Sequence, residues 1–145
     1  MARPKIRVQH FLACRGASVE GLVSPANPYT LNGVSYLFRL VANVEFPTTL
    51  PDAWVYCRFI NDRADARRVE FAVEVVWLDG RDGEELTCYY PGCHVAFRDG
   101  DPVTSRVWEL PYLKLFGKGR YELRLRSGRR SRLVAREFIR IEREP

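Results

Sequence analysis

The segment VEFAVEVVW, residues 69–77, decides the fold class. Every second position in it is apolar, and these positions are Val69, Phe71, Val73, Val75 and Trp77. A repeat of two places successive side chains on opposite faces of an extended chain, so the pattern predicts a β-strand with one buried face. The turn-forming residues of LDGRDGEE, residues 78–85, are expected to end this strand.

Further segments show the same alternation or a high content of β-branched and aromatic residues: 5–14, 34–46, 53–60, 85–90, 93–97 and 103–110. We expect 34–46 to form one long strand whose buried side runs from Val34 to Phe46. Segments 85–90 and 93–97 are expected to be two short strands around Pro91 and Gly92. In 5–14, His10 lies on the apolar side, which predicts a histidine in the core or at a strand edge.

The C-terminal part predicts a β-hairpin. In its first strand Tyr121, Leu123 and Leu125 alternate with charged residues. In the return strand the apolar side is interrupted by Glu137, so we expect a bulge that shifts the register there.

Roughly seven to nine short strands separated by turn residues are typical of a sandwich or a small barrel. We predict one all-β domain spanning residues 1–145, a two-sheet antiparallel β-sandwich of immunoglobulin-like architecture. The chain of 145 residues, 46% hydrophobic and 28% charged, is long enough to bury a core without disulfides or a metal. The motif from Gly119 to Tyr121 is also found at the start of a late strand in immunoglobulin-like modules, where the tyrosine hydroxyl can anchor the preceding corner.

The order of several short motifs resembles a family of small, uncharacterised bacterial β-sandwich proteins. The opening strand V-x-x-F-L-x-C corresponds to Val8, Phe11, Leu12 and Cys14, and the closing G-x-Y hairpin to Gly119 and Tyr121. The segment S/T-L-x-G-V is matched by Thr30, Leu31, Gly33 and Val34, and the FP dipeptide by Phe46 and Pro47. Lys118 departs from the family, which often has proline there. The resemblance implies a fold and a bacterial cytoplasmic setting, and it implies no reaction.

The cysteines and the hydropathy pattern also predict a cytoplasmic protein. No apolar run approaches the roughly 20 residues that span a bilayer, so we expect no membrane segment. The apolar run at 11–14 is too short for a signal peptide. In a reducing compartment the thiols are expected to be buried small hydrophobic groups; they are Cys14, Cys57, Cys88 and Cys93.

Several residue clusters could form chemical sites, but each also has a simpler structural explanation. Cys88, Cys93 and His94 could bind zinc if the two thiols met across a hairpin, but packed strand cysteines are the expected arrangement. Cys93 and His94 are neighbours on a strand and point to opposite faces, which argues against a thiol nucleophile. Two alternatives remain: a cation site in the acidic turn of Asp79, Asp82, Glu84 and Glu85, and a sugar platform of Trp54, Tyr56, Trp108 and Tyr112. We predict no metal and no cofactor.

Positive charge is concentrated at the C-terminal end. Residues 118–145 hold ten Lys or Arg against four Glu, a balance of +6, whereas residues 1–117 hold thirteen against fourteen acids, a balance of −1. The candidate residues for binding an anionic partner are Arg120, Arg124, Arg126, Arg129, Arg130 and Arg132. We expect the first three to share one face of a strand and the last three to lie at the loop, which together would form a positive ridge. The chain has twenty arginines and three lysines, and genome composition or protection of a strand edge could also explain that excess.

No catalytic motif occurs: the sequence has no G-x-S-x-G elbow, phosphate-binding glycine loop or H-E-x-x-H helix. We therefore predict that the protein is not an enzyme but a non-catalytic protein-interaction or assembly module, associating with itself or with another protein. The alternative is binding of a polyanion or nucleic acid by the arginine-rich hairpin, with strong salt dependence.

Overall fold

β-Strands are the regular elements of the chain in a computed structural model, which describes residues 6–19, 29–32, 34, 36–81, 83–127 and 132–145. The all-β prediction is confirmed for these residues. The strands are β1 (Ile6–Cys14), β2 (Gly16–Val19), β3 (Tyr29–Asn32), β4 (Leu37–Leu40), β5 (Thr48–Leu50), β6 (Trp54–Asn61), β7 (Arg67–Gly80), β8 (Gly83–Phe97), β9 (Val103–Glu109), β10 (Leu113–Leu115), β11 (Gly119–Ser127) and β12 (Arg132–Arg143). Nothing in this described part forms a helix able to cross a membrane.

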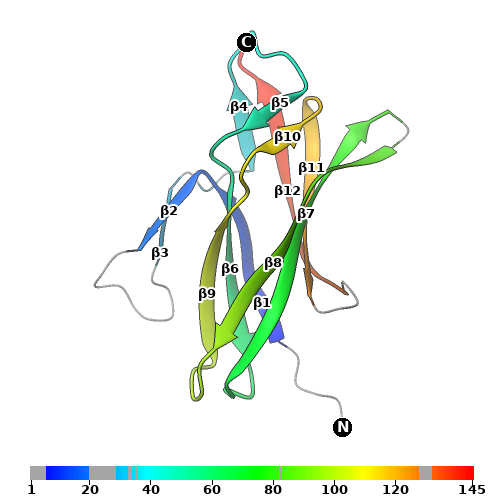
Figure 1. The fold of residues 1–145 in the computed structure, drawn as a ribbon. Coiled ribbons are helices and arrows are strands. Elements are labelled where there is room, and N and C mark those ends of the chain that lie inside the picture. Colours follow the sequence, from blue (N-terminus) through cyan, green and yellow to red (C-terminus); the bar gives the residue numbers. More distant parts are fainter. Residues whose placement is uncertain (1–5, 20–28, 33, 35, 82, 128–131) are drawn as a thin grey trace.

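Two sheets make up the body of the molecule (Figure 1). One has the strand order β1-β6-β9, and the other has the order β4-β12-β11-β7-β8. Phe59 of β6 stacks on Phe71 of β7 with ring centroids 4.7 Å apart, so the sheets pack face to face. The core between them includes Val55, Val73 and Leu123, all essentially inaccessible to solvent. This arrangement is the expected two-layer sandwich.

Two short ribbons accompany the sheets, β5 with β10 and β2 with β3. Leu50 of β5 and both Leu113 and Leu115 of β10 belong to the core cluster. The β5–β10 ribbon thus covers the end of the sandwich nearest the C-terminus (Figure 1). Strands of three or four residues are too short to show a clear period of two, and neither ribbon was predicted.

The C-terminal hairpin of β11 and β12 forms as predicted, and it contains a bulge. Ala135 pairs with Leu125 and Leu133 pairs with Arg126, so Val134 is the additional residue. Val134 packs against the core, while Glu137 stays in register opposite Leu123. The bulge therefore lies earlier in β12 than Glu137.

The prediction of one strand over 34–46 is wrong. Among the described residues of this segment only Leu37–Leu40 is a strand, and the chain reverses in a turn closed by the hydrogen bond from Val44 N to Val41 O. Val34 and Tyr36 are exposed rather than buried. The antiparallel prediction is also wrong for one pair, because β4 runs parallel to β12, with Phe38 opposite Ile141.

Two further expectations are corrected by bulges. Segments 85–90 and 93–97 form the single strand β8, which bends at Pro91 and Gly92, where the register with β7 shifts. Proline is tolerated at such a bulge because it has no N–H to donate. In β1 a register shift between Val8 and His10 puts Phe11 on the core side, so His10 is exposed rather than in the core.

Candidate functional site

The predicted arginine ridge lies on the outer sheet face, by which we mean the side of the five-stranded sheet turned away from the three-stranded sheet. Arg120, Arg124 and Arg126 alternate in β11 with the buried Tyr121, Leu123 and Leu125. The structure therefore places all three on one face, as expected. Arg132 is exposed at the start of β12. Arg129 and Arg130 fall outside the described residues.

Each of the three β11 arginines is paired with a carboxylate. Arg120 Nη2 lies 2.8 Å from Asp79 Oδ1, and Arg126 Nε lies 2.9 Å from Glu74 Oε2. The hydrogen bond from Arg120 lowers the pKa of the Asp79 carboxyl and raises that of Arg120. These partners come from β7, the neighbour of β11 in the sheet.

Arg124 makes the most enclosed of these pairs. Its Nε lies 2.6 Å from Glu122 Oε1 and its Nη2 lies 2.9 Å from Glu84 Oε1. The Glu122 side chain is 6% exposed and that of Arg124 is 17% exposed. The hydrogen bond to Glu122 raises the pKa of Arg124. A carboxylate and a guanidinium are thus held in contact in the middle of the outer sheet face.

Apolar side chains flank this pair in one row across four strands. Phe138 of β12 pairs with Glu122, Glu122 with Val76 of β7, and Val76 with Leu86 of β8. Val76 is buried at the centre, whereas Phe138 and Leu86 at the two ends are 49% and 55% exposed. Tyr89 lies in the next row opposite Glu74 and is also exposed. The outer sheet face therefore combines exposed apolar groups, the paired arginines of β11 and the exposed Arg136, which lies opposite Arg124.

The cysteines do not come together as a zinc site requires. Because β8 is one strand, Cys88 and Cys93 are separated along it by about 15 Å. Lys114 N donates to Cys88 Sγ at 3.3 Å, while Cys93 packs against the core and His94 is exposed on the other face. Within the described residues no three His, Cys, Asp or Glu side chains are placed to hold a metal.

The other two alternatives also lose support. Asp79 and Glu84 of the acidic turn are occupied by Arg120 and Arg124, and Asp82 lies outside the described residues. The four aromatic residues do not share one platform. Tyr56 is buried and hydrogen-bonded to Ser105, and Trp108 packs against Phe59 in the core, whereas Tyr112 is 83% exposed.

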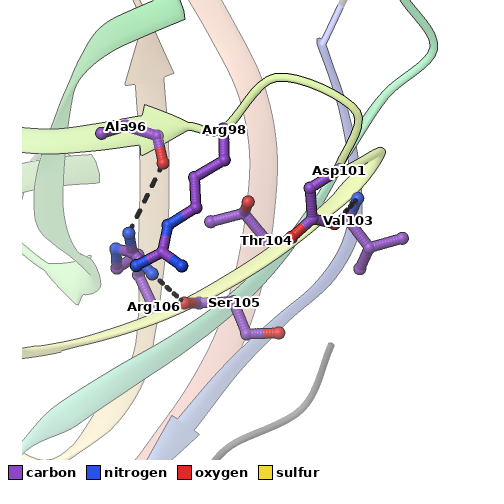
Figure 2. A pocket seen from close by; sticks show the side chains of 7 residues that line it. All are labelled: Ala96, Arg98, Asp101, Val103, Thr104, Ser105 and Arg106. Atoms are coloured by element: carbon purple, nitrogen blue, oxygen red, sulfur yellow. Dashed lines mark hydrogen bonds between the residues drawn. The ribbon is translucent and has the colours of Figure 1, made fainter. Parts of the chain in front are cut away.

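A pocket that the sequence did not suggest lies between the end of β8 and the start of β9 (Figure 2). Its volume is about 210 Å³, and it is lined by Ala96, Arg98, Asp101, Val103, Thr104, Ser105 and Arg106. Asp101 Oδ1 accepts the Val103 N–H at 3.2 Å, and Arg106 donates to the carbonyl oxygens of Ser105 at 2.8 Å and Ala96 at 3.5 Å. The residues come from two strands that do not pair with each other and from the connection between them, which is why sequence alternation gave no sign of the pocket.

Comparison with known proteins identifies the fold and no activity. No family model and no curated protein matches the chain. Its structure is similar to part of the alkylpurine DNA glycosylase AlkC of Pseudomonas fluorescens bound to DNA (TM-score 0.52, 5% identity, covering 94% of this chain and 30% of that one). It is also similar to part of a β-glucosidase of Listeria innocua (TM-score 0.52, 10% identity, covering 95% of this chain and 16% of that one). A third similar structure is part of a β-D-glucoside glucohydrolase of Trichoderma reesei (TM-score 0.53, 9% identity, covering 97% of this chain and 19% of that one). The chain thus spans less than a third of each of these proteins.

Proposed function

We propose that this chain is a non-catalytic assembly module that pairs with a second copy of itself through the outer sheet face. The supporting observation is the row from Phe138 to Leu86, whose exposed ends flank the enclosed pair of Glu122 and Arg124. Aromatic residues and arginine are enriched in protein interfaces. The face combines both with carboxylates that pair with Arg120, Arg124 and Arg126.

The balance of charge favours a second copy over a partner of one charge sign. Arg120, Arg124 and Arg126 are each paired within the face, so a partner does not have to supply their counter-charges. A two-fold dimer brings the same patch together twice and therefore requires a self-complementary surface. Five strands spaced about 4.8 Å apart make the face about 20 Å wide. With the nine residues of β11 along its length, it approaches the roughly 800 Å² per partner of a standard interface.

We place the module in the bacterial cytoplasm, with an immunoglobulin-like architecture. Cys57, Cys88 and Cys93 are free thiols, as is usual in a reducing compartment. The hydroxyl of Tyr121 bonds to the backbone of Gly117, a contact that resembles the tyrosine corner of immunoglobulin-like domains and supports this part of the proposal.

Polyanion or nucleic-acid binding by the arginine-rich hairpin remains the alternative. It has less support, because the three arginines of β11 are already bound to carboxylates. The similarity to a DNA-bound glycosylase concerns the fold alone and gives the nucleic-acid alternative no further support.

The test is the mass of the protein in solution, measured by light scattering at micromolar concentrations. We expect twice 16.8 kDa for the native chain and a monomer for Phe138→Arg. Val41→Arg is the matched control, because Val41 is exposed and lies outside the outer sheet face, in the turn after β4; it should remain a dimer. A native monomer contradicts the proposal. A native monomer that also binds DNA, with an affinity lost at high salt, supports the alternative instead.

A further inference from the structure

The pocket between β8 and β9 holds two guanidinium groups on a fixed backbone. Gly100 N donates to Ala64 O at 2.6 Å and Asp101 N donates to Arg98 O at 3.2 Å, so the connection between the two strands is tied to the loop before β7 and to itself. Arg98 follows β8 directly and Arg106 lies within β9. Figure 2 shows both side chains extending into the pocket from its two sides.

Arg106 is positioned but not neutralised. It pairs with Cys57 of β6, whose side chain is in the core, so Arg106 is directed to the inner side of its sheet. Its two hydrogen bonds go to the backbone carbonyls of Ser105 and Ala96, which carry no charge. A guanidinium has five N–H donors in a fixed plane, so donors remain for a further acceptor. The carbonyls thus orient the Arg106 group and leave its charge uncompensated.

The charge in the pocket is net positive. Among the described residues, no carboxylate oxygen lies within ion-pair distance of the Arg98 or Arg106 guanidinium, whereas each of the three β11 arginines discussed above has such a partner. Asp101 lines the same pocket, but one of its oxygens accepts the Val103 N–H. Two guanidinium groups against one carboxylate leave a formal charge of about +1, and like charges in a small pocket repel unless an anion lies between them.

We propose that Arg98 and Arg106, with the hydroxyl of Thr104, bind a small tetrahedral oxyanion: inorganic phosphate or the phosphoryl group of a small molecule. Arginine suits this class because its planar donors can bond two oxygens at once. The pocket of about 210 Å³ is smaller than the roughly 300–1,000 Å³ of sites that enclose drug-sized ligands, which favours a group of a few atoms. The site is separate from the outer sheet face and does not depend on the proposed self-association.

Calorimetric titration with inorganic phosphate, in a buffer free of other oxyanions, tests the site. We expect saturable binding that weakens at least tenfold in Arg98→Gln and in Arg106→Gln. Arg98 is exposed, so its variant should fold normally even if Arg106→Gln does not. Arg81→Gln is the matched control, since it removes the same charge from an exposed position just before the other end of β8, and its affinity should equal that of the native chain.

Two comparisons complete the experiment. Tighter binding of phenyl phosphate than of free phosphate identifies a phosphorylated molecule as the source of the oxyanion, and the reverse order identifies the free ion. The proposal is overturned if sodium chloride of equal ionic strength gives the same heat as phosphate. It is equally overturned if the folded Arg98→Gln variant binds phosphate as tightly as the native chain.

Discussion

The hydroxyl of Tyr121 donates a hydrogen bond to the carbonyl oxygen of Gly117 and accepts one from the Gly117 N–H, so one side chain satisfies both backbone groups of that residue. Tyr121 is inaccessible to solvent and stacks against Trp77, with ring centroids 6.3 Å apart. Its ring belongs to the core while its hydroxyl fixes the loop before β11. This contact ties the turn at Gly117 to the packing between the two sheets.

Replacing Tyr121 by phenylalanine keeps the ring and removes only the hydroxyl. Two backbone groups of Gly117 then lose their partner, and we expect the free energy of unfolding to fall by about 1–3 kcal/mol. Urea denaturation measures the change. Tyr89→Phe is the control, because Tyr89 is exposed on the outer sheet face and should change stability by no more than about 0.5 kcal/mol. Equal stability of the two variants would contradict the anchoring role.

The same tyrosine predicts a loss of stability at alkaline pH. Burial raises the pKa of Tyr121 to about 12, against about 10 for a tyrosine in an unfolded chain. Because the folded state holds this proton more tightly, the stabilisation is complete below about pH 10 and is lost as the pH rises towards 12. We expect the stability of the native chain to decline more steeply over this range than that of Tyr121→Phe. Parallel declines would show that other groups cause the loss.

The cysteines should react with a thiol reagent at different rates, because they differ in burial. Cys14 and Cys57 are fully buried, and burial raises the pKa of the Cys57 thiol well above its usual value. Since the thiolate is the reactive form, Ellman's reagent should leave both unmodified in the native protein. Cys88 and Cys93 are only partly buried and should react first. Peptide mapping identifies the labelled residues, and all four should react in denaturant. Rapid labelling of Cys57 in the native state would contradict the packing described here.

The strands that were predicted correctly are those whose alternation reflects burial directly. In β7 the apolar positions Phe71, Val73 and Val75 face the core, because one side of a central strand is covered along its length. The prediction for 34–46 failed because apolar residues there are not all buried, and alternation does not show where the chain turns. Exposed Val34 and Tyr36 continue the pattern of period two although they lie outside the core.

The candidate sites were foreseen only as far as one strand determines them. The shared face of Arg120, Arg124 and Arg126 follows from their spacing in β11. Glu122, one partner of Arg124, lies two residues before it in β11, but the other carboxylate partners come from β7 and the start of β8, so those ion pairs depend on the strand order, which spacing within a strand does not reveal. Arg98 and Arg106 meet for a similar reason, since they approach across the edge of the sandwich rather than along one strand.

The enclosed pair of Glu122 and Arg124 should contribute more to stability than an exposed pair. In Glu122→Ala the Arg124 guanidinium loses its partner at 2.6 Å and keeps Glu84 at 2.9 Å. Removing one partner of an isolated buried ion pair lowers the free energy of unfolding by about 3–5 kcal/mol. Because Arg124 keeps its contact with Glu84, we expect a smaller decrease of about 1–3 kcal/mol. Urea denaturation at neutral pH gives the value.

The exposed pair of Arg140 and Glu142 supplies the matched control. Their side chains are 63% and 40% exposed although the atoms are 2.8 Å apart, so solvent screens the attraction. Glu142→Ala should therefore change the stability by no more than about 0.5 kcal/mol. If Glu122→Ala is as mild as Glu142→Ala, the centre of the outer sheet face is hydrated in solution, and its charges do not form the enclosed, neutralised pair that makes this face suitable for a second copy.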